Sequence, residues 1–187
     1  MVKGTSDYAQ ETYHAVGVAK ALGIAQGTNN KYNPKANITR RDFMLMLYRA
    51  FLADDYKTFN VTSNFPDVVK GTDAYSQEIY QAVGVAKYLG ITNGSDGKYL
   101  PNKNITREEA MTLIYRTLDI LNKDLDFTSS NRTGDFTDYS KVSAYAKDPL
   151  KYLIEHGVVL GTEGKINPKS NITRAEMAVI LHRVLTY

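Results

Sequence analysis

The chain has 187 residues and carries 23 Lys and Arg against 20 Asp and Glu, which gives a formal net charge of only +3. It contains no cysteine, so disulfide scaffolds, thiolate metal sites and cysteine nucleophiles are excluded. The lack of basic blocks argues against nucleic acid binding, and no apolar run approaches the roughly 18 residues of a membrane span.

One unit is repeated three times along the chain, at a spacing of 67 residues. The tripeptide Ile-Thr-Arg begins at Ile38, Ile105 and Ile172, and more than half of the residues are identical when 2–49 is aligned with 69–116. Such self-similarity indicates a repeat architecture. The predicted repeats are residues 1–53, 65–121 and 136–187, with polar linkers at 54–64 and 122–135.

Each repeat begins with a segment whose apolar residues recur at helical spacing, which predicts an amphipathic helix. A glycine then stands where a helix ends in the left-handed conformation, which glycine adopts without steric cost. These glycines are Gly23, Gly90 and Gly157. The apolar positions before them are Tyr13, Val16, Val18, Ala19 and Leu22, then Tyr80, Val83, Val85, Ala86 and Leu89, and in the third repeat Leu150, Leu153 and Ile154.

A loop rich in Gly and Asn follows at 27–34, 94–101 and 161–168, and this composition predicts tight turns. The second helix of each repeat begins at the Thr of Ile-Thr-Arg and presents one apolar face, so that each repeat is a helix–loop–helix unit.

A repeated aromatic-x-Asp motif opens the second and third repeats, as Phe65-Pro66-Asp67 and Phe136-Thr137-Asp138. Projecting the period backwards places the first of these openings before Met1. We therefore expect the natural protein to continue upstream, so that the lack of a signal peptide says nothing about export.

The motif Thr-Arg-x-Glu or Thr-Arg-x-Asp predicts the start of the second helix. Thr at the N-cap with an acidic residue three positions later forms a capping box. The predicted capping residues are Thr39, Thr106 and Thr173 with Asp42, Glu109 and Glu176. The cap does not explain the Arg at the first helical position, because a cation is unfavourable at the positive end of the helix dipole. Each Arg therefore requires a partner, either a carboxylate of the protein or an external anion.

Together these motifs resemble the S-layer homology (SLH) domain, and Ile172–Glu176 matches the family's closing motif letter for letter. The resemblance implies an all-α fold in which three helix–loop–helix repeats form one pseudo-threefold helical bundle with grooves between neighbours. It also implies a non-catalytic module, extracellular on the bacterial cell surface, that anchors a fused cargo domain to a secondary cell-wall polymer containing pyruvylated N-acetylmannosamine.

By the same resemblance, Arg40, Arg107 and Arg174 meet the carboxylate of the sugar, and Asp67 and Asp138 meet its hydroxyls or a network within the groove. Tyrosines replace the tryptophan with which the family usually builds the groove wall. Tyr145 occupies that place in the third repeat. The candidates are Tyr8 or Tyr13 in the first repeat and Tyr75 or Tyr80 in the second.

The sequence leaves the roles of some repeated residues open. Arg49, Arg116 and Arg183 recur late in the second helices, where they complement the dipole or share in ligand binding. His14, His156 and His182 fall at non-equivalent positions without metal-ligand spacing, and no catalytic constellation stands out, so neither a metal, a cofactor nor an enzymatic activity is expected. The alternative to glycan binding is a protein–protein interaction or S-layer assembly module without direct glycan binding.

Overall fold

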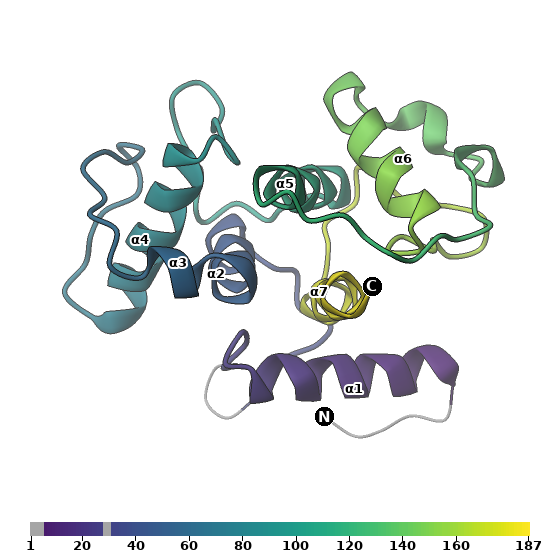
Figure 1. Cartoon of the computed structure of the whole chain (residues 1–187), viewed down its shortest axis with the longest axis horizontal. Helices are drawn as coiled ribbons and strands as arrows, with labels where there is room; N and C mark the ends of the chain where they lie inside the picture. The colour runs from purple at the N-terminus through teal and green to yellow at the C-terminus, as the bar shows by residue number, and fades with distance from the viewer. Residues whose placement is uncertain (1–5, 28–30) are drawn as a thin grey trace.

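A computed structural model describes residues 6–27 and 31–187 of the chain (Figure 1). Within these ranges the chain forms seven α-helices and three short 3₁₀-helices. The only β-structure in the described residues consists of isolated β-bridges. No helix in this part of the chain has the length and apolarity to cross a membrane. The helices are α1 (Asp7–Ala21), α2 (Arg40–Phe51), α3 (Ala53–Tyr56), α4 (Ala74–Tyr88), α5 (Arg107–Ile120), η1 (Thr133–Asp135), η2 (Tyr139–Lys141), η3 (Ala144–Ala146), α6 (Lys147–Glu155) and α7 (Arg174–Thr186).

The first helices of repeats one and two are α1 and α4, and polar side chains cap both. Ser6 accepts a hydrogen bond from the backbone N–H of Ala9, and Asp73 accepts one from that of Ser76. The glycines after the first helices all have a positive φ, between 70° and 77°. In the third repeat the first helix is the shorter α6, preceded by η3 and carrying Pro149 in its first turn, where a missing N–H costs no hydrogen bond.

The second helices α2, α5 and α7 each begin directly after the Thr of Ile-Thr-Arg. In α5 and α7 the capping box is reciprocal, because the acidic side chain at the third helical position also accepts from the N-cap backbone. In α2 only the Thr39 side chain caps, since the shorter Asp42 makes no return bond.

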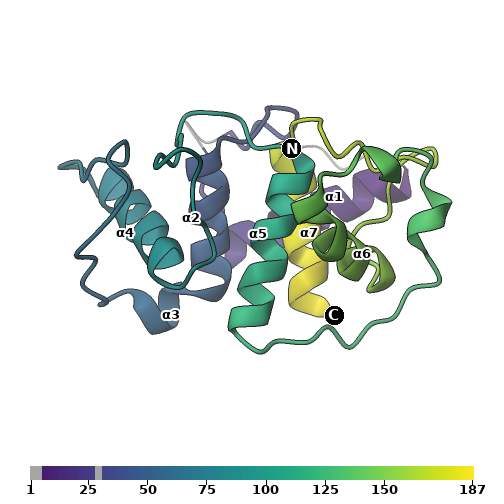
Figure 2. The same cartoon turned by 90° about the horizontal axis from the view of Figure 1, so that it is seen from above.

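The first helix of each repeat packs on the second helix of a different repeat. Helix α4 packs on α2, α6 packs on α5, and α1 packs on α7. In Figures 1 and 2, α2, α5 and α7 run side by side through the middle of the molecule and the three first helices lie outside them. The first helix of repeat two therefore packs on repeat one, that of repeat three on repeat two, and that of repeat one on repeat three, so the packing forms a closed cycle.

Three backbone hydrogen bonds close the same cycle at the centre of the molecule. Ile38 N–H donates to the carbonyl of Ile172 at 3.0 Å, Ile105 to Ile38 at 3.2 Å, and Ile172 to Ile105 at 3.1 Å. All three isoleucines are fully buried. Such a cycle is what repeats arranged around a common axis require, and it fixes the starts of the three central helices against one another.

Three details differ from the sequence-based predictions. The segment 54–64, predicted to be a linker without helix, contains most of α3, which follows the end of α2 at once and has two acidic residues in its first turn. Tyr13 and Leu22 are exposed, because α1 contacts α7 through Ala15, Val16 and other small residues. The central helices bury more than one face, since each is covered from several sides.

Candidate functional site

Three grooves of similar size lie between the repeats, with volumes of about 440, 400 and 490 Å³. The first groove is formed by α2 and the loop 24–27, the second by α5 and the loop 92–95, and the third by α7 and the loop 158–162. The corresponding positions of the three repeats line all of them. The grooves are therefore equivalent by sequence position.

Each groove also receives one tyrosine and one arginine from the two other repeats. Tyr75 and Arg174 enter the first groove, Tyr145 and Arg40 the second, and Tyr8 and Arg107 the third. Every groove thus contains side chains from all three repeats. This arrangement follows from the cyclic packing, because each repeat extends the segment at or just before its first helix to one neighbour and its Arg to the other.

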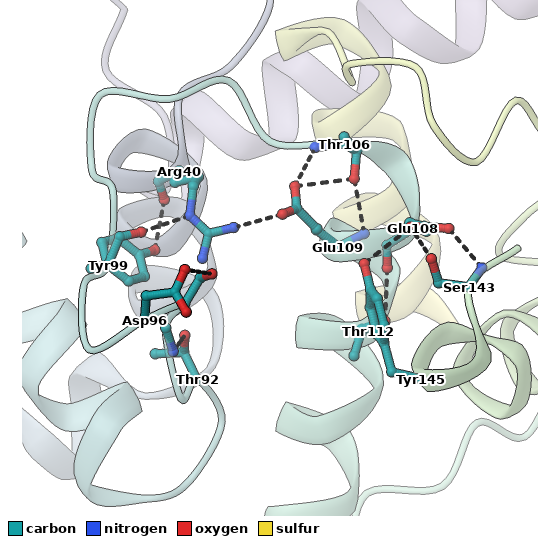
Figure 3. A network of polar contacts seen from close by, with 12 residues as sticks. Arg40, Thr92, Asp96, Tyr99, Thr106, Glu108, Glu109, Thr112, Ser143 and Tyr145 are labelled. Atoms are coloured by element: carbon teal, nitrogen blue, oxygen red, sulfur yellow. Dashed lines mark hydrogen bonds and ion pairs between the residues drawn. The ribbon is translucent and has the colours of Figure 1, made fainter.

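Arg40 shows how these arginines are held (Figure 3). Its side chain is only 9% exposed. Its Nε donates to the carbonyl of Tyr99 at 2.8 Å, and its Nη1 lies 3.2 Å from Oε1 of Glu109 across the groove. The ring of Tyr99 lies under the guanidinium, with 5.0 Å between the centroid and Cζ. Arg40 therefore ties the first repeat to the loop and the second helix of the next one.

Arg107 makes the same contacts one repeat further on. Its Nε donates to the carbonyl of Ile166 at 2.9 Å and its Nη1 donates to Oε1 of Glu176 at 2.6 Å. In both pairs the glutamate uses its other oxygen, Oε2, to cap the helix through the backbone N–H of the preceding Thr. One glutamate thus caps its own helix and neutralises the arginine of the repeat before it.

Arg174 is held by the loop but has no acidic partner in the described part of the chain. Its Nε donates to the carbonyl of Tyr32 at 2.9 Å, and the ring of Tyr32 lies 5.0 Å from its Cζ. Burial raises the pKa of Tyr32 to about 12, so its hydroxyl stays protonated and donates to the carbonyl of Arg174. No ion pair joins Arg174 to Asp42, the residue at the place of Glu109 and Glu176.

The groove tyrosines are half-exposed and two of them donate to carboxylates. The Tyr75 hydroxyl donates to Asp42, and that of Tyr145 donates to Glu108 at 3.1 Å. Partial burial, followed by these carboxylates, raises the pKa of Tyr75 to about 12 and also raises that of Tyr145. Tyr8 takes the equivalent place in the third groove, where burial and then Glu176 raise its pKa.

Glu108 is a buried carboxylate that binds Tyr145 of the second groove without lining the groove itself, and its position is occupied by Arg41 and Ala175 in the other repeats. Burial alone would raise its pKa, but Lys169 at 2.6 Å and hydrogen bonds from Ser143 and Tyr145 hold it below the usual value. Glu108 is thus a stably ionised anchor for Tyr145.

The arginines late in the second helices also line the grooves. Arg49 donates two hydrogen bonds to Glu78 on α4, and Arg183 donates two to Glu11 on α1, at 2.7 and 2.8 Å. Arg116 donates to the carbonyl of Ile91 and makes no ion pair in the described residues. Arg49 and Arg183 thus link their second helices to the first helices packed on them, whereas Arg116 binds the loop of its own repeat.

Three of the predicted ligand-binding residues lie outside the groove linings. Asp67 accepts from the backbone N–H groups of Tyr99 and Leu100, and Asp138 accepts from those of Ile166 and Asn167. Both aspartates therefore use their two oxygens within the protein, to hold the loop whose carbonyl binds an arginine. Tyr80 is partly buried against the core, so the structure favours Tyr75 over Tyr80 and Tyr8 over Tyr13 as groove walls.

Sequence reasoning missed the second function of the capping glutamates and the partners of the late arginines. Glu11 and Glu78 recur at the repeat spacing, so this signal was present in the sequence. The ion pairs themselves could not be read from it, because every one of them joins residues of different repeats.

Comparison with known proteins supports the repeat assignment. The family model described as S-layer homology domain matches residues 5–44, 64–111 and 135–178, which together are more than half of the chain. These three segments correspond to the three repeats whose helices exchange partners in the structure.

Relatives include an amylopullulanase of Thermoanaerobacterium thermosulfurigenes, 30% identical over 87% of the chain, and a surface-layer 125 kDa protein of Lysinibacillus sphaericus, 29% identical over 96%. A cellulosome-anchoring protein of Acetivibrio thermocellus is 30% identical over 62% of the chain. The matched regions span only 8%, 14% and 26% of these three proteins. From the family match and the shared repeats, the chain belongs to the S-layer homology domain family and contains three tandem repeats.

Proposed function

We propose that the chain is a non-covalent cell-surface anchoring module that binds an anionic, pyruvylated secondary cell-wall polysaccharide in the grooves between its repeats. The observation that carries this proposal is the recurrence of one groove three times, each with an arginine and a glycine-containing loop from positions 67 residues apart and with a tyrosine from another repeat. An aromatic wall beside a few directed polar groups suits a sugar, and a guanidinium suits its carboxylate.

Three similar grooves on one rigid bundle favour binding to a repetitive polymer. A second groove that meets the same chain binds at a high effective concentration, so avidity exceeds the affinity of one groove. The surface-layer and cellulosome-anchoring relatives, and the small share of each relative that is matched, agree with an anchor at the bacterial cell surface that is fused to a cargo domain.

The alternative is a protein-interaction or assembly module. It gains from one observation, namely that two of the three repeated arginines already pair with glutamates of a neighbouring repeat. In that function the grooves would contact another protein rather than a glycan.

Sedimentation with purified bacterial cell wall distinguishes the two. The chain is incubated with intact wall, with wall from which the secondary polymer has been extracted, and with wall from which only the pyruvyl groups have been removed. We expect co-sedimentation with intact wall and its loss in both treated samples, with mock-treated wall as the control. Undiminished binding after extraction would contradict glycan anchoring and favour a protein partner.

A further inference from the structure

We propose that the three grooves are not equivalent and that the first groove is the primary site for the anionic group of the ligand, with Arg174 as its specificity-determining residue. This inference rests on the proposed function, since it says where in the molecule the acidic sugar binds. It starts from a difference of one methylene group between equivalent side chains.

The length of one acidic side chain separates the first groove from the others. Arg40 lies 3.2 Å from Glu109, and Arg107 lies 2.6 Å from Glu176. The residue that stands in the same place toward Arg174 is Asp42, which is shorter, and no ion pair forms between them. Residues 1–5 and 28–30, which lie outside the described ranges, contribute no Asp or Glu to the sequence. The guanidinium of Arg174 therefore keeps its capacity for a carboxylate.

Asp42 is also engaged elsewhere. It accepts a hydrogen bond from the hydroxyl of Tyr75, the aromatic wall of the same groove. In the second groove the corresponding tyrosine, Tyr145, binds Glu108 instead and leaves Glu109 to Arg40. The tyrosine of the first groove thus holds the carboxylate that would otherwise compete with a ligand for the arginine.

The charged residues that line the grooves also favour the first groove as the site for an anion. The first groove is lined by three arginines (Arg41, Arg49 and Arg174) and one carboxylate, that of Asp42. Arg49 is neutralised by Glu78 from outside the lining. The Cζ of Arg41 lies 5.9 Å from the centre of the Tyr75 ring, and its Nε makes no hydrogen bond but lies 4.0 Å from a carboxylate oxygen of Asp42. An anion in this groove therefore meets Arg174, which has no acidic partner in the described residues, and Arg41, whose one acidic contact is the 4.0 Å approach of Asp42.

The other two grooves are less cationic. The third groove has two arginines against three carboxylates, those of Asp7, Glu11 and Glu176. The second has Arg40 and Arg116 against Glu109, so Arg116 is its one arginine without an acidic partner in the described residues. Because an anion is attracted by net positive charge and repelled by carboxylates, we expect affinity to fall from the first groove to the second and then to the third.

The test is a substitution that lengthens the acidic side chain at position 42. In Asp42→Glu, the new carboxylate can reach Arg174 as Glu109 reaches Arg40, and it then competes with the ligand. The probe is a methyl glycoside of pyruvylated N-acetylmannosamine, measured by isothermal titration calorimetry. We expect Asp42→Glu to weaken binding about tenfold and Arg174→Gln to weaken it at least as much, because each removes one charge-assisted interaction. The matched control is Asp55→Glu, the same lengthening on the exposed helix α3, which we expect to bind as the unmodified chain does.

The outcomes separate this inference from the function on which it rests. If the unmodified chain binds the glycoside and Asp42→Glu and Arg174→Gln both keep its affinity, the assignment of the first groove is wrong while glycan binding stands. Loss of binding in Arg116→Gln alone would move the site to the second groove and likewise overturn the assignment. If the unmodified chain binds neither the glycoside nor intact wall, the proposed function fails, and the inference fails with it. Thermal unfolding of each variant shows whether it is folded at the temperature of the titration.

Discussion

Asp138 supports the third groove indirectly, through the loop that binds Arg107. It is buried, and both of its oxygens accept backbone N–H groups of the loop that holds Arg107. Asp67 does the same for the loop that holds Arg40, but it is more exposed. Because a buried donor that loses its acceptor costs more than an exposed one, the two aspartates should differ in their contribution to stability.

Asp138→Ala should lower the free energy of unfolding by about 2–3 kcal/mol, and Asp67→Ala by about 1 kcal/mol, because the hydrogen bonds of Asp138 are more deeply buried than those of Asp67. Urea unfolding followed by far-UV circular dichroism measures both values. A larger loss for Asp67→Ala than for Asp138→Ala would contradict this ordering.

At the same scale, sequence reasoning identified the residue types of the site but not all of their partners. The capping motif predicted where Thr106 and Glu109 stand in their helix, because a cap is local. It could not show that Glu109 also binds Arg40, which is 69 residues away along the chain.

At the scale of helices, the contact between α1 and α7 contains the one pair of histidines in the described residues whose rings are in contact. The rings of His14 and His182 meet edge to face, with centroids 5.0 Å apart. Partial burial, followed by the charge of His14 and that of Arg183, lowers the pKa of His182 from 6.5, while Glu11 opposes this shift. The folded state therefore favours the neutral ring.

This shift predicts a pH dependence of stability. A base whose pKa is lowered by folding binds a proton more readily when unfolded, so its contribution is complete above about pH 6.5 and is lost as the pH falls below that value. We expect the melting temperature to decrease between pH 7 and pH 5 and the decrease to be smaller in His182→Gln. Differential scanning calorimetry at several pH values measures this, and parallel curves for the two proteins would show that His182 is not responsible.

At the scale of the whole molecule, the repeats cannot be separated into independent units. The first helix of every repeat packs on another repeat, and α1 at one end of the sequence packs on α7 at the other. Together with the central cycle of isoleucine hydrogen bonds, this predicts that the three repeats unfold together.

Truncation tests this prediction. The chain 1–173, which lacks α7, leaves α1 without its packing surface and should lose cooperative unfolding altogether, whereas the full chain should unfold in a single transition. Circular dichroism and tyrosine fluorescence should give coincident urea curves for the full chain. A cooperative transition of the chain 1–121, which contains only the first two repeats, would contradict the exchange of helices between repeats.

The sequence by itself determined the repeat and its period, the helix starts at Thr39, Thr106 and Thr173, the glycines that end the first helices, and the arginines that require a partner. All of these follow from local physics, that is, from helical spacing, capping and backbone conformation. Only the tertiary structure decided which repeat packs on which, because near-identical repeats offer near-identical apolar faces and the sequence does not show which face each helix takes. It also decided that Asp42, which is one methylene shorter than Glu109, leaves Arg174 without a carboxylate partner among the described residues, since side-chain length matters only where two residues meet.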